Sequence, residues 1–487
     1  MADAIAAAGM SYRPVEDAAT LAGMVARRQL SAREAVLQTL ARIEVVNGRL
    51  AAFCTLSPGA IEEADVIDRR LARGEAAGPL AGVPVAVKDL ISTRGLRTTY
   101  GSPLYADNIP LEDDVVVERL RAAGAIVIGK TNNSEFGYGP VGHNPVFATT
   151  RNPWNTDLTP GGSSAGSAAA IAAGIVPLAL GSDGGGSIRI PASLAGVFGF
   201  KPSWGRVPLY PGCRDENEPG ASGWESLEHI GPITRTVADA ALMLSVLAGP
   251  SPRDRHSLPL DDTNWLDLAS RPGARLRIAF TPDMGFALVD PQVARLALNA
   301  AHRLAEALGA TLEFASPAIG DIQSTFETLV AMDTDRVGLR RLAASRGHRF
   351  GGALADILAR DWSADDFTAA ILARKRIVNA MWRFMDDYDL FLTPSAATTA
   401  FPVDLDGPER IAGADVPASA WTPFSAFANL TGQPAASVPA GFTGEGLPVG
   451  LQIAGRHLDD IGVLRAAAAL ERAMPWAGAW PAMLAQG

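Results

Sequence analysis

Residues 79–90 read PLAGVPVAVKDL, and positions 83–87 within them form a short apolar run rich in β-branched side chains. A run of this kind, preceded by glycine and followed by charged residues, is typical of a strand that is buried on both faces. Lys88 stands directly at its end. We therefore predict a central strand that carries an amine at its carboxyl end.

Helical and strand-like segments alternate outward from this run. Residues 113–124 (DDVVVERLRAAG) have a helical pattern, and 125–132 (AIVIGKTN) form a second buried strand. Small residues at 164–174 predict a helix, and the apolar residues of 176–182 predict a further strand. The alternation predicts an α/β fold in which a mixed, mostly buried sheet is covered by helices on both faces.

The rest of the chain continues this pattern. Ser31 and Glu34 form a capping box, which predicts the start of a helix. The same reasoning predicts helices at about 59–73, 235–248, 290–308 and 459–474, strands at 276–280, 389–394, 434–440 and 447–455, and a mostly helical stretch at 321–386 with Ser363 as an N-cap.

The 487 residues are expected to form one large domain. Two polar, proline-rich segments, 249–274 and 401–420, are the candidate boundaries of an insertion. We therefore expect a single domain over residues 1–487 with a mostly helical insert or lid at about 250–410.

Composition argues against several classes of protein. Hydrophobic residues make up 48% of the chain and charged residues 19%, which suits a folded core and not a disordered segment. The net charge of −10 argues against a nucleic-acid partner, because phosphate binding needs clustered lysine and arginine. No uncharged run is long enough to span a bilayer, and the first residues lack the basic leader of a secretory signal. With only Cys54 and Cys213 as cysteines, we expect a cytoplasmic protein with no membrane partner.

Two serine-containing segments are candidates for nucleophilic chemistry, and the first is 160–167 (PGGSSAGS). Residues 162–166 match G-x-S-x-G, the nucleophile elbow of α/β-hydrolases, which would make Ser164 the nucleophile. An elbow needs a preceding strand, whereas the residues before Ser164 form a turn-rich loop. The elbow is therefore a weak interpretation.

The second segment, 181–193, reads GSDGGGSIRIPAS. Its three consecutive glycines, Gly184 to Gly186, suggest a place where the backbone must approach another group closely. Their N–H groups could form an oxyanion hole for a carbonyl attacked by Ser187, although an ordinary glycine-rich turn explains the run equally well.

The predicted topology brings the two segments together. A helix of roughly 16 Å and a returning strand of roughly 20 Å separate Ser163 from Ser187. Because the strand runs back along the helix, we expect both serines at the same edge of the sheet, where open α/β sheets bind ligands.

The candidate base is a lysine. The histidines are scattered without metal-site spacing, and we expect each on the surface or in a loop: His143, His229, His256, His302, His348 and His457. Burial at the end of a strand penalises the ammonium form of Lys88 and lowers its pKa. A neutral lysine is a competent general base, although most lysines at strand ends reach solvent. The two serine segments make the catalytic interpretation of Lys88 preferable.

Four stretches extend these observations to a family. They read GVPVAVKDL (82–90), RNPWN…TPGGSSAGSAAAIAAG (151–174), LGSDGGGSIRIPASLAGVFGFKPSWGRVP (180–208) and LTGQPAASVPAGF…GLPVGLQIAGR (430–456). In order and spacing they resemble the amidase signature family of serine amidohydrolases, over about residues 15–475.

The resemblance implies a Ser-cisSer-Lys triad. Ser187 would be the nucleophile, Ser163 the serine at a cis peptide bond that relays the proton, and Lys88 the base. The reaction would pass through an acyl-enzyme, without a cofactor or a metal. The resemblance also assigns the oxyanion hole to the backbone of Gly184, Gly185, Gly186 and Ser187.

The resemblance also gives neighbouring residues supporting roles. Ser164 would hydrogen-bond nearby, and Asp183 and Arg189 would hold the glycine loop in shape, unless they form a simple surface ion pair. Tyr138 and Trp224 are candidate substrate-binding residues that could equally be core and surface-loop residues. The chain departs from the family pattern at Gly184, where threonine is common, at Ala165, where glycine is usual, and at Ala195, where cysteine is frequent.

Three functions fit these motifs. The first is an amidase that hydrolyses a small-molecule carboxylic amide, with an aryl amide, ester or carbamate as variants. The second is the glutaminase (A) subunit of a tRNA-dependent amidotransferase, and the third is an α/β-hydrolase-type esterase that uses Ser164 and a histidine. We favour the first and expect a small-molecule amide as the binding partner, with a homodimer left open.

Overall fold

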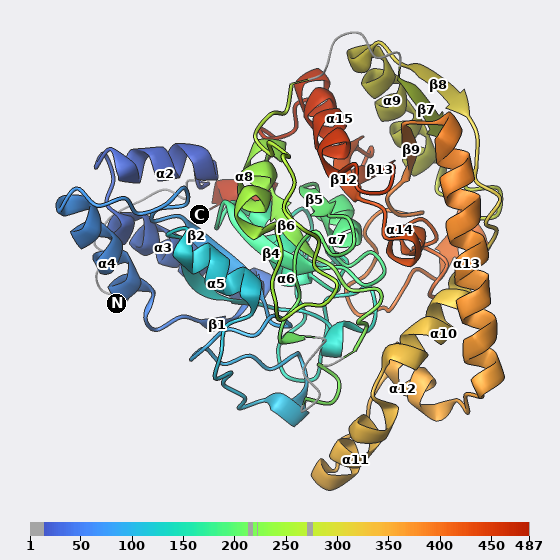
Figure 1. The fold of residues 1–487 in the computed structure, drawn as a ribbon, viewed down its shortest axis with the longest axis horizontal. Helices are drawn as coiled ribbons and strands as arrows, with labels where there is room; N and C mark the ends of the chain where they lie inside the picture. Colours follow the sequence, from blue (N-terminus) through green and yellow to red (C-terminus); the bar gives the residue numbers. More distant parts are fainter. Residues whose placement is uncertain (1–13, 213–217, 222, 270–275, 487) are drawn as a thin grey trace.

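The computed structural model describes residues 14–212, 218–221, 223–269 and 276–486 (Figure 1). Cys213 lies outside the described residues. One 11-stranded sheet runs through the molecule in the order β1-β3-β2-β4-β6-β5-β12-β13-β9-β7-β8. Its strands are β1 (Phe53–Leu56), β2 (Pro84–Lys88), β3 (Ile126–Thr131), β4 (Leu178–Ser182), β5 (Phe198–Lys201), β6 (Ile230–Thr234), β7 (Arg277–Phe280), β8 (Thr311–Phe314), β9 (Leu390–Pro394), β12 (Ala435–Phe442) and β13 (Pro448–Gly455).

Parallel and antiparallel pairs coexist in this sheet. β2 pairs in parallel with both β3 and β4, and β7 does so with β8 and β9. β6 is antiparallel to β4 and β5, and β12 is antiparallel to β5 and β13. β12 therefore joins the strands of the first half of the chain to those of the second half.

The α-helices range in length from the 6 residues of α14 to the 24 residues of α13. They are α2 (Ala18–Ala26), α3 (Ala32–Leu50), α4 (Ala60–Ala72), α5 (Val115–Ala122), α6 (Ala165–Ala172), α7 (Arg189–Ala195), α8 (Val237–Leu247), α9 (Pro291–Leu308), α10 (Gln323–Asp333), α11 (Arg336–Arg346), α12 (Gly352–Ala359), α13 (Ala364–Asp387), α14 (Ala426–Thr431) and α15 (Asp460–Ala473). A separate two-stranded hairpin is formed by β10 (Arg410–Ile411) and β11 (Ala414–Asp415).

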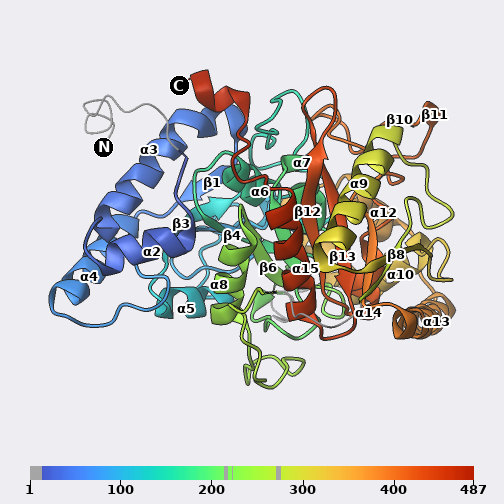
Figure 2. The same cartoon turned by 90° about the horizontal axis from the view of Figure 1, so that it is seen from above.

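Side chains of the sheet alternate between two apolar layers. Val85 and Val87 belong to the cluster under α5, α8, α9 and α15, whereas Ala86 belongs to the cluster on the opposite face, with α3, α4, α6 and α7. Figure 2 shows α8, α15 and α9 side by side over the first face. The predicted mixed sheet with helices on both faces is confirmed.

Local signals explain several helix ends. The capping box of α3 is present, since Ser31 Oγ accepts from the N–H of Glu34 and the Glu34 carboxylate accepts from the N–H of Ser31. Ser363 caps α13 in the same way. Helix α6 can pack closely because Gly166 lacks a side chain, which would otherwise meet the backbone of Ala52 and Asn132.

The sequence pattern does not predict two central strands, β5 and β6. β5 contains Gly199, and β6 contains Gly231 and Pro232. Glycine and proline usually mark turns and weaken a strand pattern. Burial on both faces in the middle of the sheet overrides that local preference.

Residues 250–410 contribute both to the sheet and to a helical group. β7, β8 and β9 extend the sheet, and α9 covers it. Helix α10 packs against α13, and α12 and α11 lie farther from the sheet (Figure 1). In the described parts of the chain, no helix combines the length and the apolar character needed to cross a membrane.

Candidate active site

The carboxyl ends of β2 and β4 hold the candidate base. Lys88 is the last residue of β2 and is fully buried. Its Nζ donates to Ser163 Oγ at 2.7 Å, to Ser182 Oγ at 2.9 Å and to the Ser182 carbonyl at 3.3 Å. Three oxygen acceptors therefore fix the amine in one place.

Burial changes the acidity of this amine. It lowers the pKa of Lys88 to about 8, while the negative charges of Glu228 and Asp183 act in the opposite direction. An amine with a pKa in this range can accept a proton near neutral pH.

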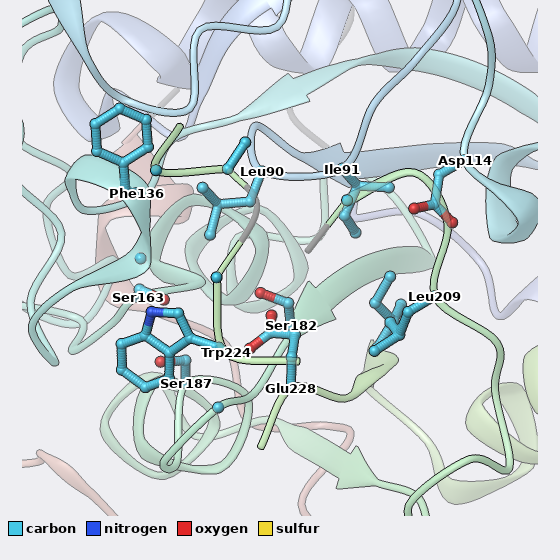
Figure 3. A pocket seen from close by; sticks show the side chains of 17 residues that line it. Leu90, Ile91, Asp114, Phe136, Ser163, Ser182, Ser187, Leu209, Trp224 and Glu228 are labelled. Atoms are coloured by element: carbon cyan, nitrogen blue, oxygen red, sulfur yellow. The ribbon is translucent and has the colours of Figure 1, made fainter. Parts of the chain in front are cut away.

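The first serine segment lies directly against Lys88. The Gly162–Ser163 peptide is cis, and Ser163 is buried. Ser164 donates from Oγ to the Ser182 carbonyl at 3.2 Å and from its N–H to the Ser187 carbonyl at 3.2 Å. The two serine segments are thus in contact, and Ser163, Ser182 and Ser187 line one cavity (Figure 3).

A buried ion pair shapes the glycine loop. Arg189 Nη2 lies 2.8 Å from Asp183 Oδ1, and both side chains are fully buried. Burial alone would raise the pKa of Asp183, but the guanidinium of Arg189 holds it well below its usual range. Asp183 Oδ1 also accepts from the N–H of Gly186 at 2.7 Å. The pair therefore organises the loop from inside the protein and is not a surface ion pair.

Helix α14 and its N-cap residue, Ser425, support the same loop. Asn429 Nδ2 donates to the carbonyl of Asp183 at 2.7 Å, and Ser425 Oγ donates to the carbonyl of Gly185 at 2.5 Å. His229 is buried here too, with Nδ1 2.7 Å from the Leu227 carbonyl. His229 lies in a loop, as expected, but that loop is buried.

Two cavities meet at Ser187. The narrow one, of about 50 Å³, runs past Ser163 and Ser182 toward Asp114. The wide one, of about 670 Å³, is lined by Gly185 and Ser187 of the glycine loop and by residues of α10 and α12. Ser187 and Trp224 line both cavities.

Aromatic side chains line the wide cavity together with Ser187. The ring of Trp224 lies 5.0 Å from Tyr138 and 5.9 Å from Phe326, measured between centroids. Charged groups also line this cavity, among them Arg349 and Asp356. The arrangement can bind a molecule with an apolar body close to Ser187.

Ser182 and Glu228 are site residues that sequence reasoning missed. Ser182 directly precedes Asp183 in the glycine-rich motif, so its position in that motif was a usable signal. Glu228 lies in the irregular segment 209–232, where no periodic pattern assigns a direction to any side chain.

Comparisons with known proteins agree with this geometry. The Amidase family model matches residues 34–464. The acylamidase of Rhodococcus erythropolis is 37% identical over 472 residues, which cover 96% of this chain and 97% of that protein. The A subunit of the glutamyl-tRNA(Gln) amidotransferase of Geobacter metallireducens is 36% identical over 480 residues, covering 92% and 95%.

A solved structure gives the same result in three dimensions. A bacterial aryl acylamidase of the amidase signature enzymes superposes with a TM-score of 0.86 at 33% identity, covering 95% of this chain and 97% of that one. The chain therefore belongs to the amidase family, as an amidase signature hydrolase of amide C–N bonds.

Proposed function

We propose that the protein hydrolyses a small-molecule carboxylic amide through Ser187, Ser163 and Lys88. The observation that carries the proposal is the 2.7 Å contact between Lys88 Nζ and Ser163 Oγ, beside a cavity that Ser163 shares with Ser187. A serine needs a base to become a nucleophile, and a neutral lysine reached through a second hydroxyl meets that need.

The proposed reaction passes through an acyl-enzyme on Ser187. Ser187 Oγ gives its proton to Ser163 Oγ, whose own hydrogen passes to the neutral amine of Lys88. Ser187 Oγ then bonds to the amide carbon. Collapse of the tetrahedral intermediate breaks the C–N bond, and the relay run backwards protonates the departing amine. Water activated by the same relay then releases the acid from the acyl-enzyme.

The glycine loop supplies donors for the developing oxyanion. Because the N–H of Gly186 already donates to Asp183, we assign this role to the N–H groups of Gly184, Gly185 and Ser187. Backbone donors fixed in advance are effective because they need no reorganisation during the reaction. The support from Asn429 and Ser425 keeps the loop in place.

The wide cavity favours an amide with an aromatic or other apolar group. Tyr138, Trp224 and Phe326 line this cavity together with Ser187, and aromatic rings bury large apolar surfaces. The name of the Rhodococcus relative, an acylamidase, and that of the solved aryl acylamidase support this choice. Esters and carbamates of similar shape would react through the same steps.

The helical group of residues 250–410 would act as a lid over this cavity. Side chains of two of its helices line the cavity: Gln323, Phe326 and Val330 from α10, and Asp356 and Ile357 from α12. A lid from a separate helical group would close over the bound substrate and select substrates by shape.

Glutamine hydrolysis as part of a tRNA-dependent amidotransferase is the second candidate. The Geobacter amidotransferase relative supports it, and so does the presence of both Arg349 and Asp356 in the wide cavity. The α-carboxylate of glutamine would need a positively charged partner, and its α-amino group a negatively charged one. An esterase centred on Ser164 has less support, because Ser164 Oγ donates to the Ser182 carbonyl.

A substrate panel tests these alternatives. Purified protein is assayed with aryl, aliphatic and carbamate amides and with glutamine, and Ser187→Ala protein serves as the blank. Turnover of an aryl amide that is lost in the variant supports the proposal. If glutamine is the only amide that is hydrolysed, with release of ammonia, the second candidate replaces the proposal. No turnover of any amide would refute the proposal.

A further inference from the structure

The two cavities that meet at Ser187 differ in their access to the proton relay. Ser163 lines the narrow cavity together with Ser182 and Ser187 (Figure 3). Within the described part of the chain, the lining of the wide cavity includes Ser187 and Gly185 but not Ser163. The hydroxyl that contacts Lys88 therefore faces the narrow cavity and not the wide one.

This difference sets the orientation of an amide at Ser187, given the mechanism proposed above. The departing nitrogen takes its proton from Ser163 Oγ, so it must lie within hydrogen-bond distance of that oxygen. The carbonyl oxygen points to the N–H groups of the glycine loop. The acyl group is the remaining substituent of the carbonyl carbon, and the wide cavity is the space left for it.

The two cavities also differ in size. The narrow one measures about 50 Å³ and the wide one about 670 Å³. A protein cavity that binds benzene measures about 150 Å³, whereas one water molecule needs about 10–15 Å³. The narrow cavity therefore has room for ammonia or a short aliphatic amine but not for an aromatic ring. The wide cavity has room for a ring and for groups attached to it.

The lining of the narrow cavity suits a small nitrogen group. Asp114 is buried, and its Oδ2 has no hydrogen-bond partner among the described residues. Glu228 brings a second carboxyl group, which Figure 3 shows beside Ser182. Carboxyl oxygens accept hydrogen bonds from N–H groups, which ammonia offers on every side. Leu90 and Leu209 line the same cavity and restrict its width.

We propose that the narrow cavity is the leaving-amine site and the wide cavity the acyl site of the proposed amidase. The substrates are then primary amides, or amides of short aliphatic amines, whose acyl group is aromatic or otherwise bulky and apolar. This inference rests on the proposed function, because it uses the relay through Ser163 to place the nitrogen.

The orientation accounts for both halves of the reaction. When the C–N bond breaks, the hydrogen of Ser163 Oγ goes to the nitrogen, and Lys88 returns a proton to Ser163. Ammonia leaves from the narrow cavity, and a water molecule takes its place beside Ser163. That water gives a proton to the relay and bonds to the acyl carbon, which releases the acid and restores the Ser187 hydroxyl.

A pair of isomers tests the orientation. Phenylacetamide carries its ring on the acyl side and releases ammonia, whereas its isomer acetanilide carries the ring on the nitrogen and releases aniline. We expect wild-type kcat/KM to be at least about tenfold higher for phenylacetamide. Aniline is the better leaving group, so intrinsic reactivity would not produce this preference. Equal values, or a preference for acetanilide, would overturn the orientation.

Matched variants test each cavity separately. Leu90→Ala and Leu209→Ala widen the narrow cavity, and each should raise the kcat/KM of acetanilide relative to phenylacetamide by at least about threefold. Phe326→Ala removes an aromatic wall of the wide cavity and should lower the kcat/KM of phenylacetamide relative to acetamide by at least about tenfold. Each measure is a ratio within one protein, so partial loss of folded enzyme does not alter it. An unchanged ratio in both leucine variants would overturn the leaving-amine site, and an unchanged ratio in Phe326→Ala would overturn the acyl site.

A binding measurement separates this inference from the proposed function. Calorimetric titration of Ser187→Ala protein with phenylacetamide locates the ring without turnover. We expect added Phe326→Ala to raise Kd by at least about tenfold and added Leu90→Ala to change it by less than about twofold. Any other pattern would overturn the acyl site. Wild-type protein that hydrolyses no amide would refute the proposed function, whereas the titration would still report on the acyl site.

Discussion

Lys88 Nζ and Ser163 Oγ lie 2.7 Å apart although 75 positions separate them in the chain. The contact joins the end of β2 to the loop before α6, and it leaves no room for a water molecule between the two groups. Proton transfer between them would therefore be direct, and it would depend on the packing that holds both elements.

The two serine assignments can be separated by paired variants. Ser187→Ala should lower kcat by about 10³-fold or more, because the nucleophile is lost while binding remains. Ser164→Ala should lower it by less than about tenfold, since the Ser164 hydroxyl only exchanges hydrogen bonds with the backbone of Ser182. Rate measurements with a chromogenic aryl amide would show the difference, and the opposite order of effects would favour the esterase.

The charge state of Lys88 should set the pH dependence of the wild-type enzyme. Its pKa of about 8 means that the inactive ammonium form dominates at lower pH. We expect kcat/KM to rise with pH with a midpoint near 8 and then to level off. Lys88→Arg should be inactive throughout, because a guanidinium keeps its charge. A pH-independent kcat/KM, or an active arginine variant, would contradict the role of Lys88 as a base.

Gly184 should be intolerant of a side chain. An added Cβ would overlap the ring of Trp224 and stand 2.8 Å from Glu228 Oε2. We expect Gly184→Ala to lower kcat/KM by about ten- to a hundredfold through displacement of these neighbours. Combining it with Trp224→Ala should restore part of the loss, which a double-mutant cycle measures. Gly48→Ala, on an open face of α3, is the neutral control.

The ion pair under the glycine loop should matter for stability. Arg189→Met leaves the carboxylate of Asp183 buried without its partner and should reduce the free energy of unfolding by about 3–5 kcal/mol. The exposed pair Arg33–Asp65 provides the comparison, and Asp65→Asn should cost less than about 1 kcal/mol. Urea unfolding followed by fluorescence measures both. Equal losses of unfolding free energy in the two variants would mean that the buried ion pair stabilises the protein no more than the exposed one.

Local sequence patterns predicted those features of the structure that depend on a single helix or strand. The apolar run before Lys88 is β2, and the small-residue run at 164–174 contains α6. The expected return of the chain between Ser163 and Ser187 also holds, because a short helix followed by a strand has few ways to pack. These features depend on periodicity and length alone.

Features that depend on contacts between distant segments could not be predicted from local sequence patterns. Glu228 reaches the site because α10 and α13 hold the segment before it, and nothing in the local sequence encodes that contact. β6 contains Pro232 and is a strand only because β4 and β5 lie on either side of it. The burial of His229 also results from tertiary packing.

The support of the glycine loop by α14 has a consequence for the synthesis of the enzyme. Ser425 and Asn429 lie about 240 positions after the loop that they hold. A ribosome must therefore add about 240 further residues after it has made the loop before these two contacts can form. Until then, a growing chain carries Ser187 without the contacts that hold the glycine loop in place.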